Sequence, residues 1–218
     1  MEALQGDPHM LKHSLLFTAL MAVAGIAPAQ SLPKPAEFYF DADANATKPV
    51  IAVKETGDVA TQKLAKMIER GNNVDIAAAQ LAHMAMESGR AELGRQLYAR
   101  ALSGLETSDG AWRAVLWNYG WDLFRAGDDK AALDQWRALL SSRGVTASWM
   151  PPTFALVLWS LDRKEEAVQW YGAAVRSEPQ QWRTAGQFAR LLPAWSDQER
   201  ALLAEVQAAW AANPPAWP

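Results

Sequence analysis

The feature that most limits the fold of this chain is a long series of short amphipathic segments that begins at Asp58. Each segment spans about 11 to 17 residues and repeats its apolar residues at helical spacing, as Ala60, Leu64, Met67 and Ile68 do in the first. Short breaks rich in Gly, Asp and Pro separate the segments at Gly89, Gly110, Gly127, Gly144, Pro151–Pro152, Asp162, Pro179 and Pro193. Because a helix with one apolar face must bury that face against another element, residues 58–212 are predicted to form an all-α domain of packed helices.

Three of the breaks divide this domain into similar units. Gly89, Gly127 and Asp162 are 38 and 35 residues apart, and each is expected at the tight turn inside a helix pair. Small and aromatic residues recur around the turns: Ala82, Gly94, Tyr98 and Ala101 in the first unit, Gly120, Ala132 and Trp136 in the second, and Ala155, Ala167, Tyr171, Ala174 and Pro179 in the third. Two helices approach closely only where one presents Gly or Ala, and a large aromatic side chain then fills the remaining space.

This arrangement resembles the tetratricopeptide repeat, a helix pair of about 34 residues. The resemblance covers residues 74–180 and implies a short right-handed solenoid of helix pairs, about three to four in number, with residues 181–191 and 196–211 as an atypical last pair. Gly94 and Leu139 stand where the family has Ala, so unrelated helical hairpins are the alternative.

The N-terminus has the order of a secretory signal peptide. From Met10 a short basic stretch precedes an apolar run, Ser14 to Ile26, and Ala27-Pro28-Ala29 supplies small residues before Gln30. The apolar run of about 13 residues is short for a bilayer span. We expect residues 1–29 to be a removed leader and signal peptide, and the mature protein to be periplasmic or secreted and to begin at Gln30. The alternative is an uncleaved membrane anchor, which would be the chain's only membrane contact.

Residues 30–57 and the tail, residues 213–218, differ from the helical domain. Residues 37–40 and 49–53 are β-prone runs, so a small β-hairpin or an extended arm lying on the helices is expected. The tail is Pro-rich and is not expected to be helical.

A fragment of a calcium-binding pattern lies between the two β-prone runs. Asp41, Asp43 and Asn45 have the spacing at the start of a calcium loop. Ala46 and Ala52 occupy the positions where that loop needs Gly and Glu, so a solvated turn without metal is expected.

Few residues offer catalytic or metal chemistry. The chain has no cysteine, and His83 is the only histidine left once the leader is removed, with no triad partner marked in the sequence. The acidic pair Asp128-Asp129 is expected to cap a helix rather than to catalyse. The formal net charge of -3, without a Lys/Arg cluster, argues against nucleic acid. We therefore predict no enzymatic activity, no catalytic residue, no cofactor and no metal.

Tryptophan is the unusual component, with 11 residues that all lie between Trp112 and Trp217. The resemblance implies a concave groove lined by the first helix of each pair, at positions that correspond here to Gln80, His83, Glu87, Trp117, Asn118, Trp121, Phe124, Arg125, Trp149 and Trp159. Aromatic rings beside Asn and Arg suit an extended peptide, because rings supply contact area and polar groups hold the backbone. The predicted function is therefore a scaffold for a protein or peptide partner in the cell envelope.

Three alternatives stand beside this interpretation. The Trp-rich face could bind cell-wall glycan, since aromatic faces stack on sugar rings. The protein could also be a toxin-neutralising or enzyme-accessory protein of the envelope. Finally, Trp121 and Trp159 could pack between repeats as core residues instead of lining a groove.

Overall fold

The computed structural model describes residues 32–35, 41–143 and 145–216. The predicted signal peptide, residues 1–29, and the predicted mature start at Gln30 lie outside the described residues. In the described part, no helix is both long enough and apolar enough to cross a membrane.

The described residues form ten α-helices and one short 3-10 helix and contain no β-strand, which confirms the all-α fold class. In chain order the elements are α1 (Gly57–Glu69), α2 (Val74–Glu87), α3 (Ala91–Ser103), α4 (Gly110–Arg125), α5 (Asp129–Ser141), α6 (Met150–Ser160), α7 (Lys164–Ser177), α8 (Pro179–Trp182), η1 (Ala185–Gln187), α9 (Phe188–Leu191) and α10 (Asp197–Ala212).

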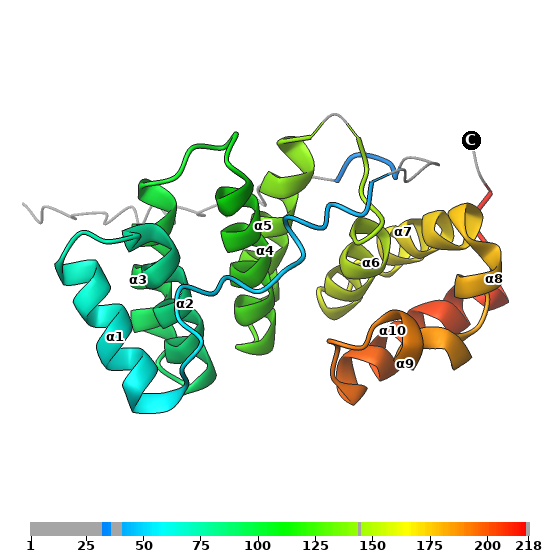
Figure 1. Ribbon diagram of the computed structural model, residues 1–218. Coiled ribbons are helices and arrows are strands. Elements are labelled where there is room, and N and C mark those ends of the chain that lie inside the picture. The colour runs from blue at the N-terminus through cyan, green and yellow to red at the C-terminus, as the bar shows by residue number, and fades with distance from the viewer. Residues whose placement is uncertain (1–31, 36–40, 144, 217–218) are drawn as a thin grey trace, which may run out of the picture. The chain divides into compact units, whose positions relative to one another are not determined.

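Neighbouring helices pack in pairs, α2 with α3, α4 with α5 and α6 with α7 (Figure 1). The short connection inside each pair contains a residue with positive φ: Gly89 at 76°, Gly127 at 80° and Asp162 at 58°. This left-handed conformation ends a helix and reverses the chain within a few residues. The three turns therefore fall where the sequence pattern predicted them. Successive pairs are in contact with one another, α2 with α4 and α5 with α6.

A large aromatic side chain is buried in the second helix of each pair. Tyr98, Trp136 and Tyr171 each follow their turn by nine residues, and each is 0% exposed. Gly120 on α4 shows why a small residue is needed opposite the ring, since a Cβ there would lie 2.2 Å from Nε1 of Trp136. The small-to-large contact therefore sets how closely α4 and α5 approach.

Ala167 on α7 provides a test of this packing in the third pair. Its side chain is 0% exposed, so the larger side chain of an Ala167→Leu variant has no free space. Overpacking of this kind is expected to lower the free energy of unfolding by about 1–3 kcal/mol. Denaturant unfolding measures the change, and a midpoint equal to that of the parent would contradict the tight contact.

The predicted last helix pair is wrong in its first half. Residues 181–191 do not form one helix, because α8, η1 and α9 divide this stretch into short pieces. The second half, α10, is a continuous helix that begins with a capping box: Ser196 accepts from the backbone N–H of Glu199, and the Glu199 carboxylate accepts from the backbone N–H of Ser196. These bonds satisfy amides that lack a partner at a helix start.

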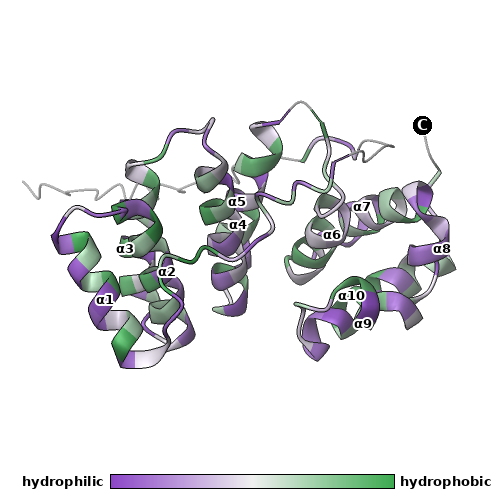
Figure 2. Cartoon of the chain, in the orientation of Figure 1, coloured by the Kyte–Doolittle hydropathy of each residue, from purple (hydrophilic) through white to green (hydrophobic). Residues whose placement is uncertain are grey.

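Helix α6 is the most completely buried helix, with nine of its residues buried. Figure 2 shows the contrast with α1, along which hydrophilic and hydrophobic residues alternate. Pro151 and Pro152 were predicted to interrupt the helices at this point, but they lie in the first turn of α6. Proline is tolerated there because the first backbone N–H groups of a helix have no acceptor within it.

Residues 41–56 have no helix, and the only pairing of strand type among the described residues is one isolated bridge between Asp41 and Ala147. Residues 49–53 form no strand, and residues 37–40 lie outside the described part, so no hairpin is seen. The expectation of a solvated turn at Asp43 is wrong, because Asp43 is only 4% exposed. We call residues 41–56 the N-terminal segment.

Candidate functional site

A cavity of about 800 Å³ lies between α2, α4, the start of α6, the N-terminal segment and the loop of residues 191–195. This volume falls in the range of small-ligand and peptide pockets. Eight of the ten predicted groove residues line it: Gln80, His83, Glu87, Trp117, Asn118, Trp121, Arg125 and Trp149. The spacing between the helix pairs therefore brings these eight side chains to one place.

The remaining two predicted groove residues do not line the cavity. Phe124 packs against the rings of Trp121 and Trp136, with centroids 6.0 and 6.2 Å away. Trp159 donates from its indole Nε1 to Glu205 at 2.9 Å, and the ammonium of Lys164 lies 3.8 Å from its ring centroid. Both residues are thus held by neighbours within the helical domain.

The tryptophans of the cavity wall are also part of the hydrophobic core. Trp121 and Trp149 are each 7% exposed, while Trp117 is half-buried. The ring of Trp121 lies edge-on to that of Trp195, with centroids 4.9 Å apart, and Trp117 has the same relation to Trp149 at 4.6 Å. The indole rings of the cavity wall therefore belong to a packed aromatic cluster, and little of Trp121 or Trp149 is exposed.

A polar network that the sequence analysis missed occupies one wall of the cavity. Nδ1 of His83 donates to the carboxylate of Asp122, at 2.9 Å from Oδ1, and the hydroxyl of Tyr98 donates to Oδ2 at 2.6 Å. Asp122 is only 5% exposed, so these two bonds compensate for the burial of its charge. Asp122 could have been noticed as an acid inside the apolar run of α4. Its distance from His83 along the chain hides the pairing.

The His83–Asp122 contact affects how stability depends on pH. The hydrogen bond that His83 donates to Asp122 is the largest cause that raises the pKa of His83 above its ordinary value of 6.5, against the opposing effect of burial. A pKa raised by folding adds stability that is fully present below about pH 6.5 and is lost as the pH rises through the folded-state pKa.

We therefore expect the melting temperature to fall between about pH 6 and pH 8, and to fall less in a His83→Gln variant. Thermal melts of the parent and the variant across this range measure the difference. His83 is the only histidine in the part of the chain that the structure describes, which simplifies the assignment. Equal slopes for the two proteins would contradict the role of His83.

Two of the predicted groove residues bind the backbone of the chain's own N-terminal segment. Oε1 of Gln80 accepts from the backbone N–H of Ala52 at 2.7 Å and of Val53 at 2.9 Å, while its Nε2 donates to the carbonyl of Val53 at 2.9 Å. Nδ2 of Asn118 donates to the carbonyl of Lys48 at 2.9 Å. The side chains expected to hold a peptide thus hold a non-helical stretch of this chain.

Arg125 is engaged within the helical domain. Its Nε donates to Glu199 at 2.9 Å, and its guanidinium carbon lies 5.2 Å from the ring centroid of Trp121. The Glu199 side chain is 7% exposed, so this ion pair ties α4 to the start of α10 from a partly buried position. Arg125 is therefore bound to a carboxylate of this chain, whereas the sequence analysis placed it among the polar groups that hold a partner's backbone.

The cavity wall presents indole rings, side-chain amides and a His–Asp pair. In the described ranges, no three His, Cys, Asp or Glu side chains are grouped so as to hold a metal ion. Nε2 of His83 faces the carboxylate of Glu87 at 3.5 Å.

No protein-family model, no curated protein and no solved structure matches this chain.

Proposed function

We propose that the protein is a non-enzymatic scaffold of the periplasm that holds an extended segment of a protein partner along α2, α4 and the start of α6. The observation that carries the proposal is the contact of Gln80 and Asn118 with the backbone of residues 48–53. Both side chains contact main-chain groups, which every peptide has, so the face is suited to extended backbone in general.

The proposed architecture is a right-handed, tetratricopeptide-like solenoid in which α2, α4 and α6 line the concave face. The equivalent turns at Gly89, Gly127 and Asp162 support it, as do the aromatic residues that follow each turn by nine positions. In such an array each helix pair contacts its neighbours, and the first helices together present a continuous surface.

One polar group of the cavity is accessible to a partner, because the Glu87 side chain is 66% exposed. Glycan is the weaker candidate, because Trp121 and Trp149 are too buried to offer flat faces to a sugar ring.

A site-specific photo-crosslinking experiment tests the proposed function. A photoreactive amino acid replaces Glu87, which is exposed at the cavity, and in a second protein it replaces Glu92, which is exposed on α3 and does not line the cavity. In the protein's native envelope we expect position 87 to crosslink to a polypeptide partner and position 92 not to do so. The same crosslinks from both positions, or none from position 87, would contradict the proposal.

A further inference from the structure

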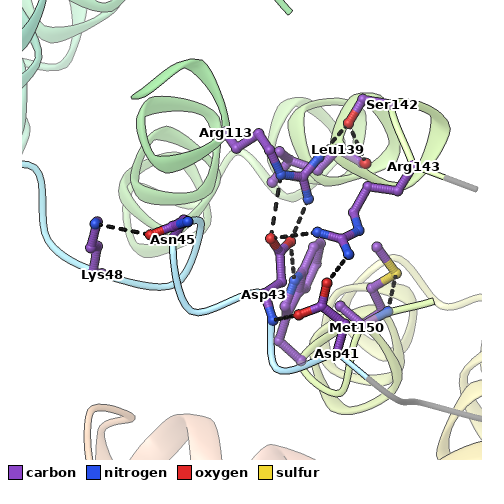
Figure 3. A network of polar contacts seen from close by, with 11 residues as sticks. Asp41, Asp43, Asn45, Lys48, Arg113, Leu139, Ser142, Arg143 and Met150 are labelled. Carbon is purple, nitrogen blue, oxygen red and sulfur yellow. Dashed lines mark hydrogen bonds and ion pairs between the residues drawn. The ribbon is translucent and has the colours of Figure 1, made fainter. Parts of the chain in front are cut away.

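A group of charged contacts of the N-terminal segment is centred on Asp43, which does not line the cavity (Figure 3). One carboxylate oxygen of Asp43 accepts from Nη1 of Arg143 at 2.8 Å and from Nε of Arg113 at 3.3 Å. The other accepts from Nη2 of Arg113 and, at 3.1 Å, from the indole Nε1 of Trp149. Two guanidinium groups and an indole therefore surround a single carboxylate.

Asp41 is the second acid of the segment that pairs with these arginines. Its carboxylate pairs with Nη2 of Arg143, so two acids of the segment face two arginines of the helical domain. The side chains of Arg113 and Arg143 are only 11% and 19% exposed with the acids in place, so their charges are balanced mainly by the two carboxylates and little by water. Nε of Arg143 is also buried without a hydrogen-bond partner among the described residues. We call Arg113, Arg143 and Trp149 the carboxylate pocket.

One continuous stretch of chain occupies the carboxylate pocket and lines part of the cavity. From the bridge between Asp41 and Ala147 the segment passes Asn118 on α4 and then Gln80 on α2 before α1 begins (Figure 1). The hydrogen bonds described above join side chains of the helical domain to the backbone or the acids of the segment. The exception is one backbone bond, from the N–H of Ser148 to the carbonyl of Asp41. The segment is thus held as a bound peptide is held, without becoming part of a sheet or helix.

We propose that the partner segment carries two carboxylates two residues apart, followed by an extended apolar stretch, and that it replaces residues 41–53 on the same surface. This inference rests on the function proposed above and adds the chemistry of the partner. The two carboxylates neutralise Arg113 and Arg143, and the stretch that follows takes the bonds of Asn118 and Gln80. Charge-assisted bonds to arginine are strong and geometrically specific, so the acidic pair determines which segments bind.

The test converts the segment into a separate peptide. A protease site is inserted between Lys54 and Glu55, which are both exposed, so that the full chain folds intact and is then cut. A fluorescent peptide with the sequence of residues 41–54 is titrated against cut and uncut protein, and anisotropy reports binding. We expect saturable binding to the cut protein and at least about tenfold weaker binding to the uncut protein, whose own segment competes.

The matched control is the same peptide with Asp41→Asn and Asp43→Asn, which keeps its shape and removes both charges. We expect it to bind the cut protein at least about tenfold more weakly than the acidic peptide. The inference is overturned if the two peptides bind equally, or if cut and uncut protein bind the acidic peptide equally. It is also overturned if a folded cut protein neither retains its fragment nor binds the peptide.

A second variant covers the case in which cutting unfolds the protein. The intact chain with Asp41→Asn and Asp43→Asn should bind the acidic peptide more tightly than the parent does, because its own segment is weakened. If this variant also unfolds, the segment is a structural part of the domain and the inference fails. Crosslinking at position 87 does not depend on the acidic pair, so its result shows separately whether the proposed function survives.

Discussion

A Trp121→Ala variant is expected to lose about 3–5 kcal/mol of the free energy of unfolding. The side chain is 7% exposed, and its ring lies 5.1 Å from that of Trp136 and 4.9 Å from that of Trp195, between centroids. Truncation would leave a cavity among large, rigid rings that cannot close around it. Chemical denaturation followed by circular dichroism measures the loss.

Trp159→Ala is the matched control for this prediction. Trp159 is half-buried, and its contacts with Glu205 and Lys164 involve exposed groups, so a loss of about 1 kcal/mol is expected. If Trp121→Ala were as stable as Trp159→Ala, Trp121 would be a free groove residue after all. In that case its loss should weaken partner binding instead of folding.

A Gly120→Ala variant is expected to destabilise the protein by about 3 kcal/mol, although alanine ordinarily favours a helix over glycine. The added Cβ would lie 2.2 Å from Nε1 and 2.6 Å from Cε2 of Trp136. Trp136 is 0% exposed and cannot move aside into solvent. The helices α4 and α5 would have to separate, which would also disturb the aromatic cluster around Trp121.

Gly172→Ala in α7 separates this clash from helix propensity. A Cβ added at this position would lie 3.4 Å from Pro215 and 3.5 Å from Trp210, which are ordinary contacts. This variant is expected to be unchanged or more stable by up to about 1 kcal/mol. In thermal melts Gly120→Ala should therefore lower the melting temperature while Gly172→Ala leaves it unchanged or raises it, and an equal fall in both variants would contradict the close α4–α5 contact.

The periodicity of the sequence was sufficient to predict the helix pairs, and the resemblance to the tetratricopeptide repeat predicted eight of the residues that line the cavity. Turns at Gly89, Gly127 and Asp162 set the register of each pair, and the register determines which face of α2 and α4 meets the next pair. The resemblance then placed Gln80 and Asn118 on one surface, and both residues line the cavity. The same reasoning failed for residues 181–191, where short apolar stretches do not distinguish one helix from several turns.

The sequence could not show which partners the polar side chains would find. His83 meets Asp122, Arg125 meets Glu199, and Arg113 meets Asp43, and each pair joins residues far apart in the chain. From its neighbours in the sequence, Asp43 is predicted to lie in a solvated turn. Its burial depends on residues from distant parts of the chain that pack against it. For the same reason the sequence left open whether Trp121 lines a groove or packs in the core, since its burial depends on residues far away in the chain.

The sequence by itself determined that the chain is helical, where its helix pairs turn and which aromatic residues fill them, because helix formation and pairing follow from spacings within about 40 residues. The tertiary structure decided that the predicted groove holds residues 48–53 of the chain itself and that Asp43 is buried between two arginines. Ion pairs and side-chain bonds to a distant backbone have no period along the chain, since they depend on distance in space and on exclusion of water. Only the folded arrangement of the helices brings those groups together.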